Sequence, residues 1–361
     1  MSTKDNVLSS LKSLTEGEFL SGEELALSCS VSRAAIWKAI KSLQDEGYTI
    51  EAVTNRGYRI ISSPDKLSEA GIADYLSKNG ISGVNIFTFE EIDSTNSEAK
   101  RRSATAGAFR DAEGNLTEKS KSLHISLFAS ESQTGGKGRL GRTFISPKDT
   151  GVYFSLLYSP KKGVKNPSLY TAAAAVAVKR SVSKLYGEEA KIKWVNDIFL
   201  CGKKISGILV EGITNFETGI IDAAVVGIGI NIRKNHNLSG EITKIIGSIE
   251  ESKSAKEEKL PEVSKNELVA EVTKNLIQLY DSFENPENSA VKSEMINEYR
   301  ASSMLTGQKV TVNPVAGSNF NSYSAKVKGI SEEIKLLVED DSGKIHELSS
   351  GEVSLHSYDF V

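Results

Sequence analysis

The sequence predicts an α+β protein built in three consecutive parts. Residues 1–62 carry three short helical patterns followed by two alternating strands, and residues 66–303 combine long helices with several strands. Residues 305–361 are dominated by short strand patterns separated by turns. A chain of 361 residues is long enough for two or three domains, since a typical domain has about 100–200 residues.

The first part has the pattern of a winged helix-turn-helix. A helical stripe opens it, and the run from Ser21 to Glu24 fits a capping box that begins a second helix. Ser32 can cap a third helix, which we expect to end at Gly47. Residues 48–61 then alternate as in a two-stranded hairpin, with its turn at residues 55–57.

The third helix of this part is predicted to contact DNA. Arg33 lies at the helix start, which reads base edges in this motif, and lysines farther along can hold phosphate. The alternative is a small structural helical domain without DNA, and the cations favour DNA binding. The predicted DNA-binding residues are Ser32, Arg33, Lys38 and Lys41.

The central part is expected to follow a linker at residues 62–65. Helices are predicted over 68–78 and 171–186 and from an opening at 93–96, with a capped amphipathic helix over 264–283. The alanine run of the 171–186 helix is typical of close packing. Strands are predicted over 84–92, 122–130, 190–194, 205–212 and 220–232. Residues 107–122 and 250–265 are predicted to be inserted, solvated loops.

The run SQTGGKGRLGR, residues 132–142, is the most distinctive segment of the chain. Gly136, Gly138 and Gly141 match the spacing of a dinucleotide fingerprint, but neither the required helix nor the required acid follows them. A P-loop is excluded because Lys137 precedes a glycine instead of Ser or Thr. The remaining interpretation is a basic glycine loop that joins two strands and holds the phosphates of a nucleotide.

The third part reads as a small all-β barrel. Five short strand patterns are spread over residues 308–358. A domain of that size folds only marginally by itself, so we expect it to dock on the central part.

Composition narrows the class of protein. The 44 basic and 47 acidic residues give a net charge of −3, so any contact with nucleic acid must be local. Cys29 and Cys201 lie far apart, which suits a reducing compartment. The chain shows neither a signal-peptide pattern nor a membrane-length apolar run. We therefore expect a cytoplasmic protein without membrane contact.

Four segments of the central part are expected to converge on one site. They are DSTN at residues 93–96, Gln133 with the glycine loop, KWVNDIFLCGKKISGILVE at residues 193–211, and GIGINI at residues 227–232. The third segment places Asn196 and Asp197 at a strand end and Lys204 on the following hairpin. None is specific alone, but in this order and spacing the four segments are strongly specific.

These motifs resemble the biotin protein ligases, in particular the bifunctional type that is also the biotin operon repressor. The resemblance covers nearly the whole chain, from SRAAIWKAIKSL at residues 32–43 to SGEVSL at residues 350–355. It implies a mixed-sheet α/β catalytic domain like those of class II aminoacyl-tRNA synthetases and biotin ligases, followed by an SH3-like barrel. The implied domains are a DNA-binding domain at 1–62, a biotin- and ATP-binding catalytic domain at 66–303, and the barrel at 305–361.

The resemblance also implies the reaction. Biotin and ATP with Mg²⁺ would give biotinyl-5′-AMP and pyrophosphate, and the acyl group would pass to a lysine of a biotin carboxyl carrier protein. The chain would also act as a biotin-responsive repressor that binds operator DNA as a homodimer with biotinyl-5′-AMP.

The roles implied for individual residues follow from this chemistry. A carboxylate attacking the α-phosphorus of ATP needs fixed cations and N–H donors, and Lys204 and Arg139 are the expected catalytic residues. The residues expected to bind biotin are Ser94, Thr95, Asn96, Gln133, Gly136, Lys137, Gly138, Arg139 and Lys204. The residues expected to bind the nucleotide are Arg139, Arg142, Asn196, Asp197 and Asn231, with Asp197 as the Mg²⁺ ligand.

The chain departs from the family pattern at four positions: Lys137 and Leu140 stand where arginine is usual, Val195 where proline is, and Phe144 where tryptophan is common. Lysine lacks the bidentate fork of arginine. We therefore expect weaker retention of the adenylate, and a Lys137→Arg change should slow its dissociation.

The same motifs disfavour two other functions. A DNA-binding biotin sensor with a vestigial enzyme site is disfavoured because Lys204, Arg139 and Asp197 are present. A lipoate or octanoate ligase on the same fold is disfavoured by the winged helix and by the SGEVSL segment.

Overall fold

A computed structural model describes residues 2–15, 17–45, 48–62, 65–107, 109–111, 113–215, 218–285, 288–313, 321–349 and 352–355. They belong to two compact units, Met1–Lys66 and Leu67–Val361. The predicted helix end at Gly47, the linker residues 63–64, and residues 350–351 of the SGEVSL segment lie outside the described residues.

The first unit is a winged helix-turn-helix, as predicted. Its helices are α1 (Thr3–Lys12), α2 (Gly22–Ser28) and α3 (Arg33–Asp45), and its hairpin pairs β1 (Thr49–Val53) with β2 (Gly57–Ser62). The predicted capping box at α2 is present, because Ser21 and Glu24 bond reciprocally. Buried aliphatic side chains of the three helices and of β1 form one core.

Gly57 is required by the close contact between the wing and the preceding helical segment. Its φ of +112° is a conformation that other residues rarely adopt, and a Cβ there would lie 2.1 Å from the carbonyl oxygen of Leu20. The wing is thereby fixed against Leu20, which pairs with Tyr58.

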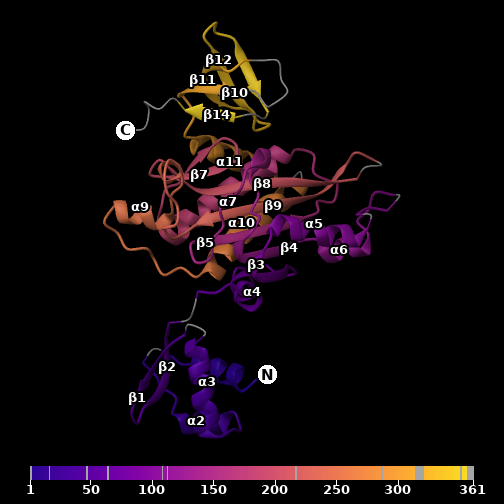
Figure 1. Ribbon diagram of the computed structural model, residues 1–361. Coiled ribbons are helices and arrows are strands. Elements are labelled where there is room, and N and C mark those ends of the chain that lie inside the picture. The colour runs from indigo at the N-terminus through magenta and orange to yellow at the C-terminus, as the bar shows by residue number, and fades with distance from the viewer. Residues whose placement is uncertain are drawn as a thin grey trace. The chain divides into compact units, whose positions relative to one another are not determined.

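The second unit is built on a mixed seven-stranded sheet in the order β3-β4-β5-β9-β8-β7-β6 (Figure 1). β3 and β4 are parallel and the other neighbours are antiparallel. The strands are β3 (Asn85–Ile92), β4 (Ser126–Gln133), β5 (Gly151–Tyr158), β6 (Lys191–Lys193), β7 (Asp197–Leu200), β8 (Lys203–Thr214) and β9 (Ile221–Asn231).

Helices cover both faces of this sheet. One face packs on α4 (Glu69–Lys78), α7 (Pro167–Tyr186) and α10 (Lys265–Glu284), with α11 (Ser289–Ala301) beside α7. The alanine run of α7 is fully buried, which confirms its packing role. The other face carries α5 (Thr95–Ala106) and α6 (Glu118–Leu123) over a smaller core that includes Phe128 and Val225.

Two segments predicted to be solvated loops are in part helical, and each contains a buried charged side chain. Residues 107–122 include most of α6, and Arg110 forms a buried ion pair with Asp222 at 2.8 Å. Residues 250–265 include most of α9 (Ile249–Ala255), where Lys253 is buried against Glu188. The prediction agrees with residues 256–259, which are exposed and outside helices. It was wrong at the buried charges, because a partner far away in sequence neutralises each of them. The strand predicted from Ser122 also begins later, at Ser126.

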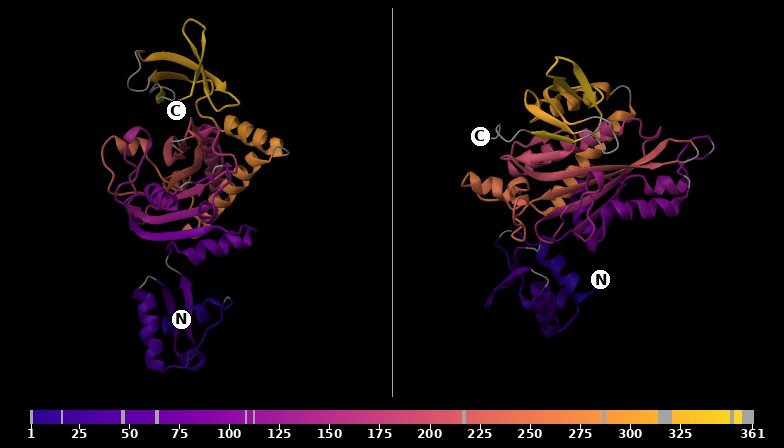
Figure 2. Two further views of the ribbon diagram at one scale, coloured as in Figure 1. Left: turned by 90° about the vertical axis from the view of Figure 1, so that its right-hand side faces the viewer. Right: turned by 45° about the horizontal axis from the view of Figure 1, so that its top comes forward.

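The C-terminal part is a five-stranded antiparallel sheet in the order β13-β12-β11-β10-β14, in keeping with the predicted SH3-like fold. Figure 2 shows this part in orange and yellow from two further directions. Its strands are β10 (Lys309–Asn313), β11 (Tyr323–Ile330), β12 (Leu336–Asp340), β13 (Ile345–Leu348) and β14 (Glu352–Leu355). Its buried side chains belong to the same hydrophobic core as the central sheet. The Trp194 indole N–H also donates to Ile334 O at 2.8 Å. Docking on the central part is thus confirmed.

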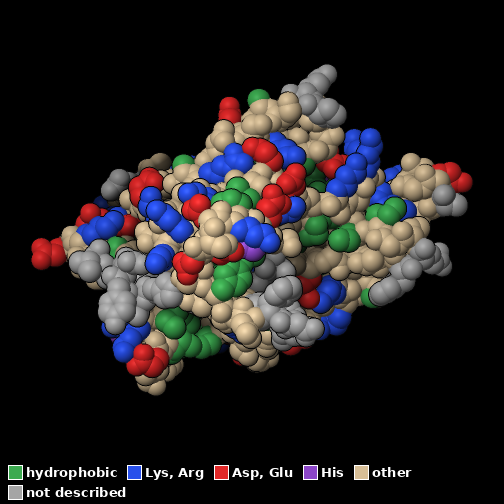
Figure 3. All heavy atoms as spheres, turned by 90° about the horizontal axis from the view of Figure 1, so that it is seen from above, with side chains coloured by type: hydrophobic (Ala, Val, Ile, Leu, Met, Phe, Trp, Pro, Cys, Tyr) green, Lys and Arg blue, Asp and Glu red, His purple; other side chains and the backbone are tan. Residues whose placement is uncertain are grey.

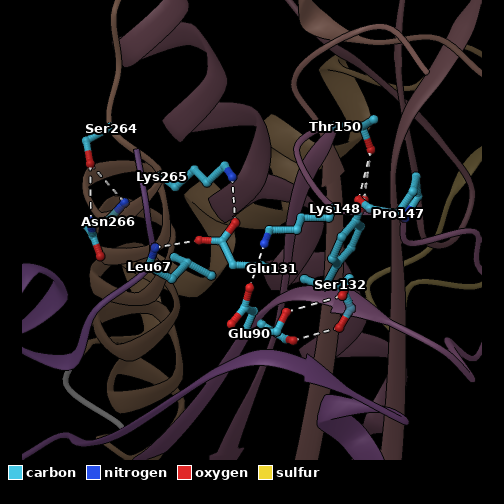
Figure 4. Close-up of polar contacts among 12 residues, drawn as sticks. Leu67, Glu90, Glu131, Ser132, Pro147, Lys148, Thr150, Ser264, Lys265 and Asn266 are labelled. Carbon is cyan, nitrogen blue, oxygen red and sulfur yellow. Dashed lines mark hydrogen bonds and ion pairs between the residues drawn. The ribbon is translucent and has the colours of Figure 1, made fainter. Parts of the chain in front are cut away.

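A buried ionic cluster fixes the point where the chain enters the second unit (Figure 4). Glu131 of β4 accepts from Lys265 Nζ and from the backbone N–H of Leu67, both at 2.6 Å. Asn266 Oδ1 accepts from the N–H of Ser68 at 2.9 Å. The first residues of the unit are therefore bound to α10 and to the strand that ends in Gln133.

The surface carries both signs of charge. Figure 3 shows lysine and arginine side chains interspersed with aspartate and glutamate on one face. Within the described part of the chain, every helix is too short or too polar to span a bilayer.

Candidate functional site

The first cavity of interest lies on the α5 face of the central sheet and has a volume of about 330 Å³. Its wall includes three glycines, Gly207 of β8 and Gly227 and Gly229 of β9. A Cβ at Gly229 would lie 2.3 Å from the Phe144 ring, and one at Gly227 would lie 2.2 Å from Asn96 Oδ1. The missing side chains make room for these two groups above the sheet.

The four predicted segments converge on this cavity, although they span more than a hundred residues of sequence. The predicted site residues that line it are Ser94, Thr95, Asn96, Gln133, Lys137, Gly138, Arg139, Arg142, Asn196, Asp197 and Lys204.

Two predicted residues lie elsewhere. Gly136 packs inside the glycine loop, where a Cβ would come within 2.3 Å of the Phe144 carbonyl oxygen, so it shapes the loop. Asn231 lines the neighbouring cavity and donates to Gly247 O at 3.0 Å.

The glycine loop leaves the end of β4, turns back on itself and leads to β5. Isolated bridges pair Gln133 with Ser146 and Lys137 with Thr143. A short 3-10 turn, η1 (Arg139–Gly141), closes the tip, where Leu140 has a φ of +56°. The expectation of a basic loop joining two strands is confirmed, and the loop places Lys137, Arg139 and Arg142 along the cavity wall.

Arg139 is held by the segment between β6 and β7. Its guanidinium donates to Asn196 Oδ1 at 3.1 Å, and Asn196 Nδ2 donates to Ile208 O at 2.8 Å. The guanidinium is thereby oriented across the cavity without a carboxylate to neutralise it in this contact.

Lys204 owes its position to a tight hairpin. Leu200 pairs with Lys203 across a two-residue turn in which Cys201 and Gly202 both have positive φ, as a type I′ turn requires. The Lys204 ammonium lies 2.7 Å from Asp197 Oδ1, and both side chains are about one-quarter exposed, at 26% and 23%.

Small polar groups of α5 and β4 also line the cavity, and Ser155 of β5 lies behind them. Gln133 Oε1 accepts from the Thr95 N–H at 2.9 Å, and Ser155 Oγ lies 2.7 Å from Thr95 Oγ1. Asn96 Nδ2 donates to Glu211 Oε2 at 2.8 Å. We call this set of uncharged hydroxyl and amide side chains, Thr95, Asn96 and Gln133, the neutral end of the cavity.

A second cavity of about 660 Å³ adjoins the first, and the two share Thr143, Phe144 and Lys204. Its wall combines the cations Arg233 and Lys234 with apolar side chains of residues 238–246. Lys204 therefore borders both cavities: its ammonium lies beside Asp197 in the first, and its carbonyl oxygen accepts from the N–H of Gly247 in the wall of the second.

Two carboxylates near the neutral end are held ionised. Hydrogen bonds from Arg101, opposed by burial, lower the pKa of Asp93 to about 2. Burial would raise the pKa of Glu211, but hydrogen bonds from Lys100 and Asn96 outweigh it and keep the pKa below its usual range. Both groups are therefore fixed acceptors at neutral pH.

The described residues do not gather three or more His, Cys, Asp or Glu side chains that could hold a metal ion. Asp197, the expected Mg²⁺ ligand, is paired with Lys204. A single paired carboxylate suits an ion that arrives on the nucleotide phosphates better than a resident ion.

Several cavity residues were missed in the sequence. Lys193 and Trp194 line the wall beside the predicted Asn196, and Ser155 and Glu211 bind the predicted Thr95 and Asn96. Lys193, Trp194 and Glu211 fall inside the quoted third segment, so the motif itself was a usable signal. Ser155 lies in a plain buried strand and gives no such signal.

The predicted DNA-contacting residues lie on and before α3. Ser32 accepts from the Ala35 N–H at 3.3 Å and caps the helix, while Arg33, Lys38 and Lys41 are exposed. Trp37, which the sequence reasoning missed, is 56% exposed with the Lys41 ammonium 5.3 Å from its ring centre. An exposed tryptophan between cations on this helix was the signal.

Comparison with known proteins agrees with this geometry. Residues 115–231 match the biotin/lipoate A/B protein ligase family, and residues 8–59 match a helix-turn-helix domain. The bifunctional ligase/repressor BirA of Bacillus subtilis (strain 168) is 34% identical over 236 residues, which is 65% of this chain and 67% of that protein. BirA of Bacillus spizizenii is 33% identical over 256 residues, 71% of this chain and 73% of that protein. The chain belongs to the biotin protein ligase family.

Solved structures agree on the fold of this biotin protein ligase family member. The biotin protein ligase of Aquifex aeolicus, in complex with biotin and ATP, superimposes with a TM-score of 0.57 at 24% identity, covering 75% of this chain and 98% of that one. At that identity the likeness concerns the fold.

Proposed function

We propose that this family member activates biotin with MgATP to biotinyl-5′-AMP and transfers biotin to a lysine of a biotin carboxyl carrier protein. The observation that carries the proposal is Lys204. Lys204 borders both cavities, and its ammonium lies beside Asp197 in the first one, where the carboxylate of biotin can meet the α-phosphate of a nucleotide that extends from the second.

The activation step brings two anions together. Biotin carboxylate attacks the α-phosphorus, a P–O bond forms, and pyrophosphate leaves with the electron pair of the broken P–O bond. Fixed cations aimed at developing charge lower such a barrier. Lys204, Arg139 and Lys137 line the same wall and supply that charge without rearrangement.

The larger cavity suits the nucleoside end of ATP. It continues from Lys204 and carries apolar side chains beside Arg233, Lys234 and the Asn231 amide. Mg²⁺ enters with the triphosphate, which agrees with the ion pair that already occupies Asp197.

The transfer step needs positioning more than new charge. The carrier lysine attacks the carbonyl carbon of the mixed anhydride, an amide bond forms, and AMP leaves. Lys204 is placed to stabilise the oxyanion and the departing phosphate, and the glycine loop in the cavity wall limits the access of water.

The neutral end of the first cavity favours biotin over lipoate or octanoate. Thr95, Gln133 and Asn96 offer hydroxyl and amide groups suited to a ureido ring. A dithiolane or alkyl chain would make no hydrogen bonds with these groups and would forgo the binding energy that a ureido ring gains from them.

The winged unit suggests the second role, repression. Arg33, Trp37 and Lys41 form an exposed stripe on α3, and a homodimer with biotinyl-5′-AMP would span two half-sites of operator DNA. Gel filtration with and without biotin and ATP tests the dimer. Identical elution at micromolar protein would contradict it.

The first experiment incubates the full chain with labelled biotin, MgATP and a biotin-carrier domain. We expect covalent label on the carrier that depends on ATP and on the carrier lysine. A carrier domain with that lysine changed to arginine is the control. Labelled lipoate or octanoate in place of biotin would reveal the alternative ligase, and a retained adenylate without transfer would indicate a sensor.

A further inference from the structure

Four oxygen atoms form a row behind the neutral end of the first cavity: Asn96 Oδ1, Ser155 Oγ, Thr95 Oγ1 and Gln133 Oε1. Their consecutive separations are 2.6, 2.7 and 3.2 Å. Asn96, Ser155 and Thr95 are buried, at 3%, 0% and 3% exposed. Hydrogen bonds within the row therefore decide what this end can offer a ligand.

Glu211 fixes one end of the row. Asn96 Nδ2 faces the Glu211 carboxylate at 2.8 Å and the Leu209 carbonyl at 3.3 Å. Both partners only accept hydrogen bonds, so the amide nitrogen must lie on their side and the amide oxygen must face Ser155. Lys100 Nζ, 2.6 Å from Glu211 Oε1, holds the carboxylate in place.

The backbone fixes the other end. The Thr95 N–H donates to Gln133 Oε1 at 2.9 Å, so the Gln133 oxygen faces Thr95. Gln133 Nε2 donates to Ser146 Oγ at 3.0 Å on the far side. The row thus begins and ends with an oxygen that has no proton.

Counting protons gives the polarity of the row. Only two hydroxyl protons, those of Ser155 and Thr95, are available for the three contacts. Ser155 has one proton for its two short contacts and gives it to Asn96 Oδ1, which has none. The Thr95 proton then serves either the 2.7 Å contact with Ser155 or the 3.2 Å contact with Gln133 Oε1, so both protons are used inside the row. Towards the cavity the Thr95 hydroxyl can offer a lone pair and no proton.

We propose that Glu211, acting through Asn96 and Ser155, makes the Thr95 end of the cavity an acceptor and thereby selects ligands that carry an N–H there. Glu211 is a positioning residue that sets specificity. The inference rests on the proposed function, in which the donor is a ureido N–H of biotin. Without the carboxylate, the Asn96 amide can turn and give a proton to Ser155. The Thr95 proton is then no longer needed at Ser155, and a ligand acceptor competes for it only with Gln133 Oε1 at 3.2 Å.

The test uses the full chain and two cyclic carbamate analogues of biotin, each with one ring N–H replaced by oxygen. Calorimetry gives the Kd of each analogue relative to that of biotin. We expect one of the two to bind about ten- to a hundredfold more weakly, because two lone pairs would face each other. If both bind as tightly as biotin, the inference is overturned while the proposed function stands. If biotin itself does not bind, the proposed function is wrong and the inference falls with it.

Two variants assign the effect to the row. In Glu211→Gln, the single amide oxygen goes to Lys100 and the NH₂ faces Asn96, so the carbamate-to-biotin Kd ratio should fall about tenfold. Ser155→Ala interrupts the row and should lower the ratio in the same direction. An unchanged ratio in both folded variants would overturn the role of Glu211.

The matched control is Glu98→Gln. Glu98 is also a carboxylate associated with α5, but it is paired with Arg101 and Arg102 on the helix surface. The carbamate-to-biotin Kd ratio of Glu98→Gln should equal that of the wild type. A drop in the control as large as in Glu211→Gln would mean that general loss of charge, not the row, causes the effect.

Discussion

Lys204 shows how much can depend on one side chain whose backbone is held by a tight turn. The Cys201–Gly202 turn and the Asp197 carboxylate together place its ammonium in the wall of the first cavity, while the residue also borders the second. Glycine at position 207 keeps space beside it, since a Cβ there would lie 3.2 Å from Lys204 Nζ. The residue is thus positioned before any substrate binds.

Lys204→Ala should lower the rate of carrier labelling by roughly 10²–10³, the cost of removing one donor aimed at developing charge. Single-turnover formation of biotinyl-5′-AMP measures the effect on activation alone. Lys191→Ala, an exposed lysine on β6, is the control and should retain the wild-type rate. An undiminished rate in Lys204→Ala would remove Lys204 from the mechanism.

His124 makes stability depend on pH. Burial lowers the pKa of its imidazole, although Asp281 and Glu284 oppose the shift, and Nδ1 accepts from the Ser159 N–H at 3.3 Å. The unfolded chain therefore binds a proton more readily than the folded one. This contribution to stability is present above the usual histidine pKa of about 6.5 and is lost as the pH falls below it.

Urea unfolding at pH 7.5 and 5.5 checks this prediction. The Trp37→Phe background leaves Trp194 as the reporter of the second unit, since the chain has 2 tryptophans. The unfolding free energy should drop more between these pH values than it does with an added His124→Gln change. Equal drops would show that another group titrates.

At the scale of elements, the Glu131–Lys265 pair joins the entry of the second unit to β4 and α10. Both side chains are 7% exposed, so removing one leaves a buried charge without its counter-ion. Gln133 and the glycine loop follow Glu131 directly along the chain. The pair therefore supports the strand that carries the site.

Lys265→Met should cost about 3–5 kcal/mol of unfolding free energy, because it strands the Glu131 carboxylate. Urea unfolding in the Trp37→Phe background gives the value. Lys148→Met removes the exposed pair with Glu90 in the same region and should change the midpoint far less. Equal losses in the two variants would mean that Glu131 is already solvated.

The site residues were predicted from the sequence where they lie in short, continuous motifs. The glycine loop, DSTN and the segment around Lys204 each have short motifs, and the structure gathers them as expected. Ser155 could not be found this way, because its role comes from the position of β5 beneath α5. The ordered segments around Arg110 and Lys253 were misjudged for the same reason: their charges are buried against Asp222 and Glu188, which no local pattern reveals. The domain limits 1–62, 66–303 and 305–361 stay predictions.

At the scale of the whole molecule, the two compact units suggest two separable activities. The cations and Trp37 of α3 belong to the first unit, and both cavities belong to the second. Variants of α3 should therefore change DNA binding while carrier labelling is unaffected.

Duplexes selected from a random library by the full chain with biotin and ATP supply the DNA for this test. Arg33→Ala should weaken the selected site by roughly 1–3 kcal/mol and relax its sequence preference, as expected for a base contact. Lys38→Ala should weaken all duplexes alike and reduce the salt slope by about 1. Failure to enrich any duplex would contradict the repressor role and leave the ligase untouched.

Phe144 offers a practical route to an altered enzyme. Its ring lies over Gly207 and Gly229 in the wall that the 330 and 660 Å³ compartments share. Trimming it to alanine would remove part of the wall between the two chambers. The enlarged cavity would accept biotin analogues with a bulky group near the carboxylate, which the wild-type enzyme would exclude. Phe144, which separates the two compartments, is thus also the position at which a ligase specific for such analogues can be engineered.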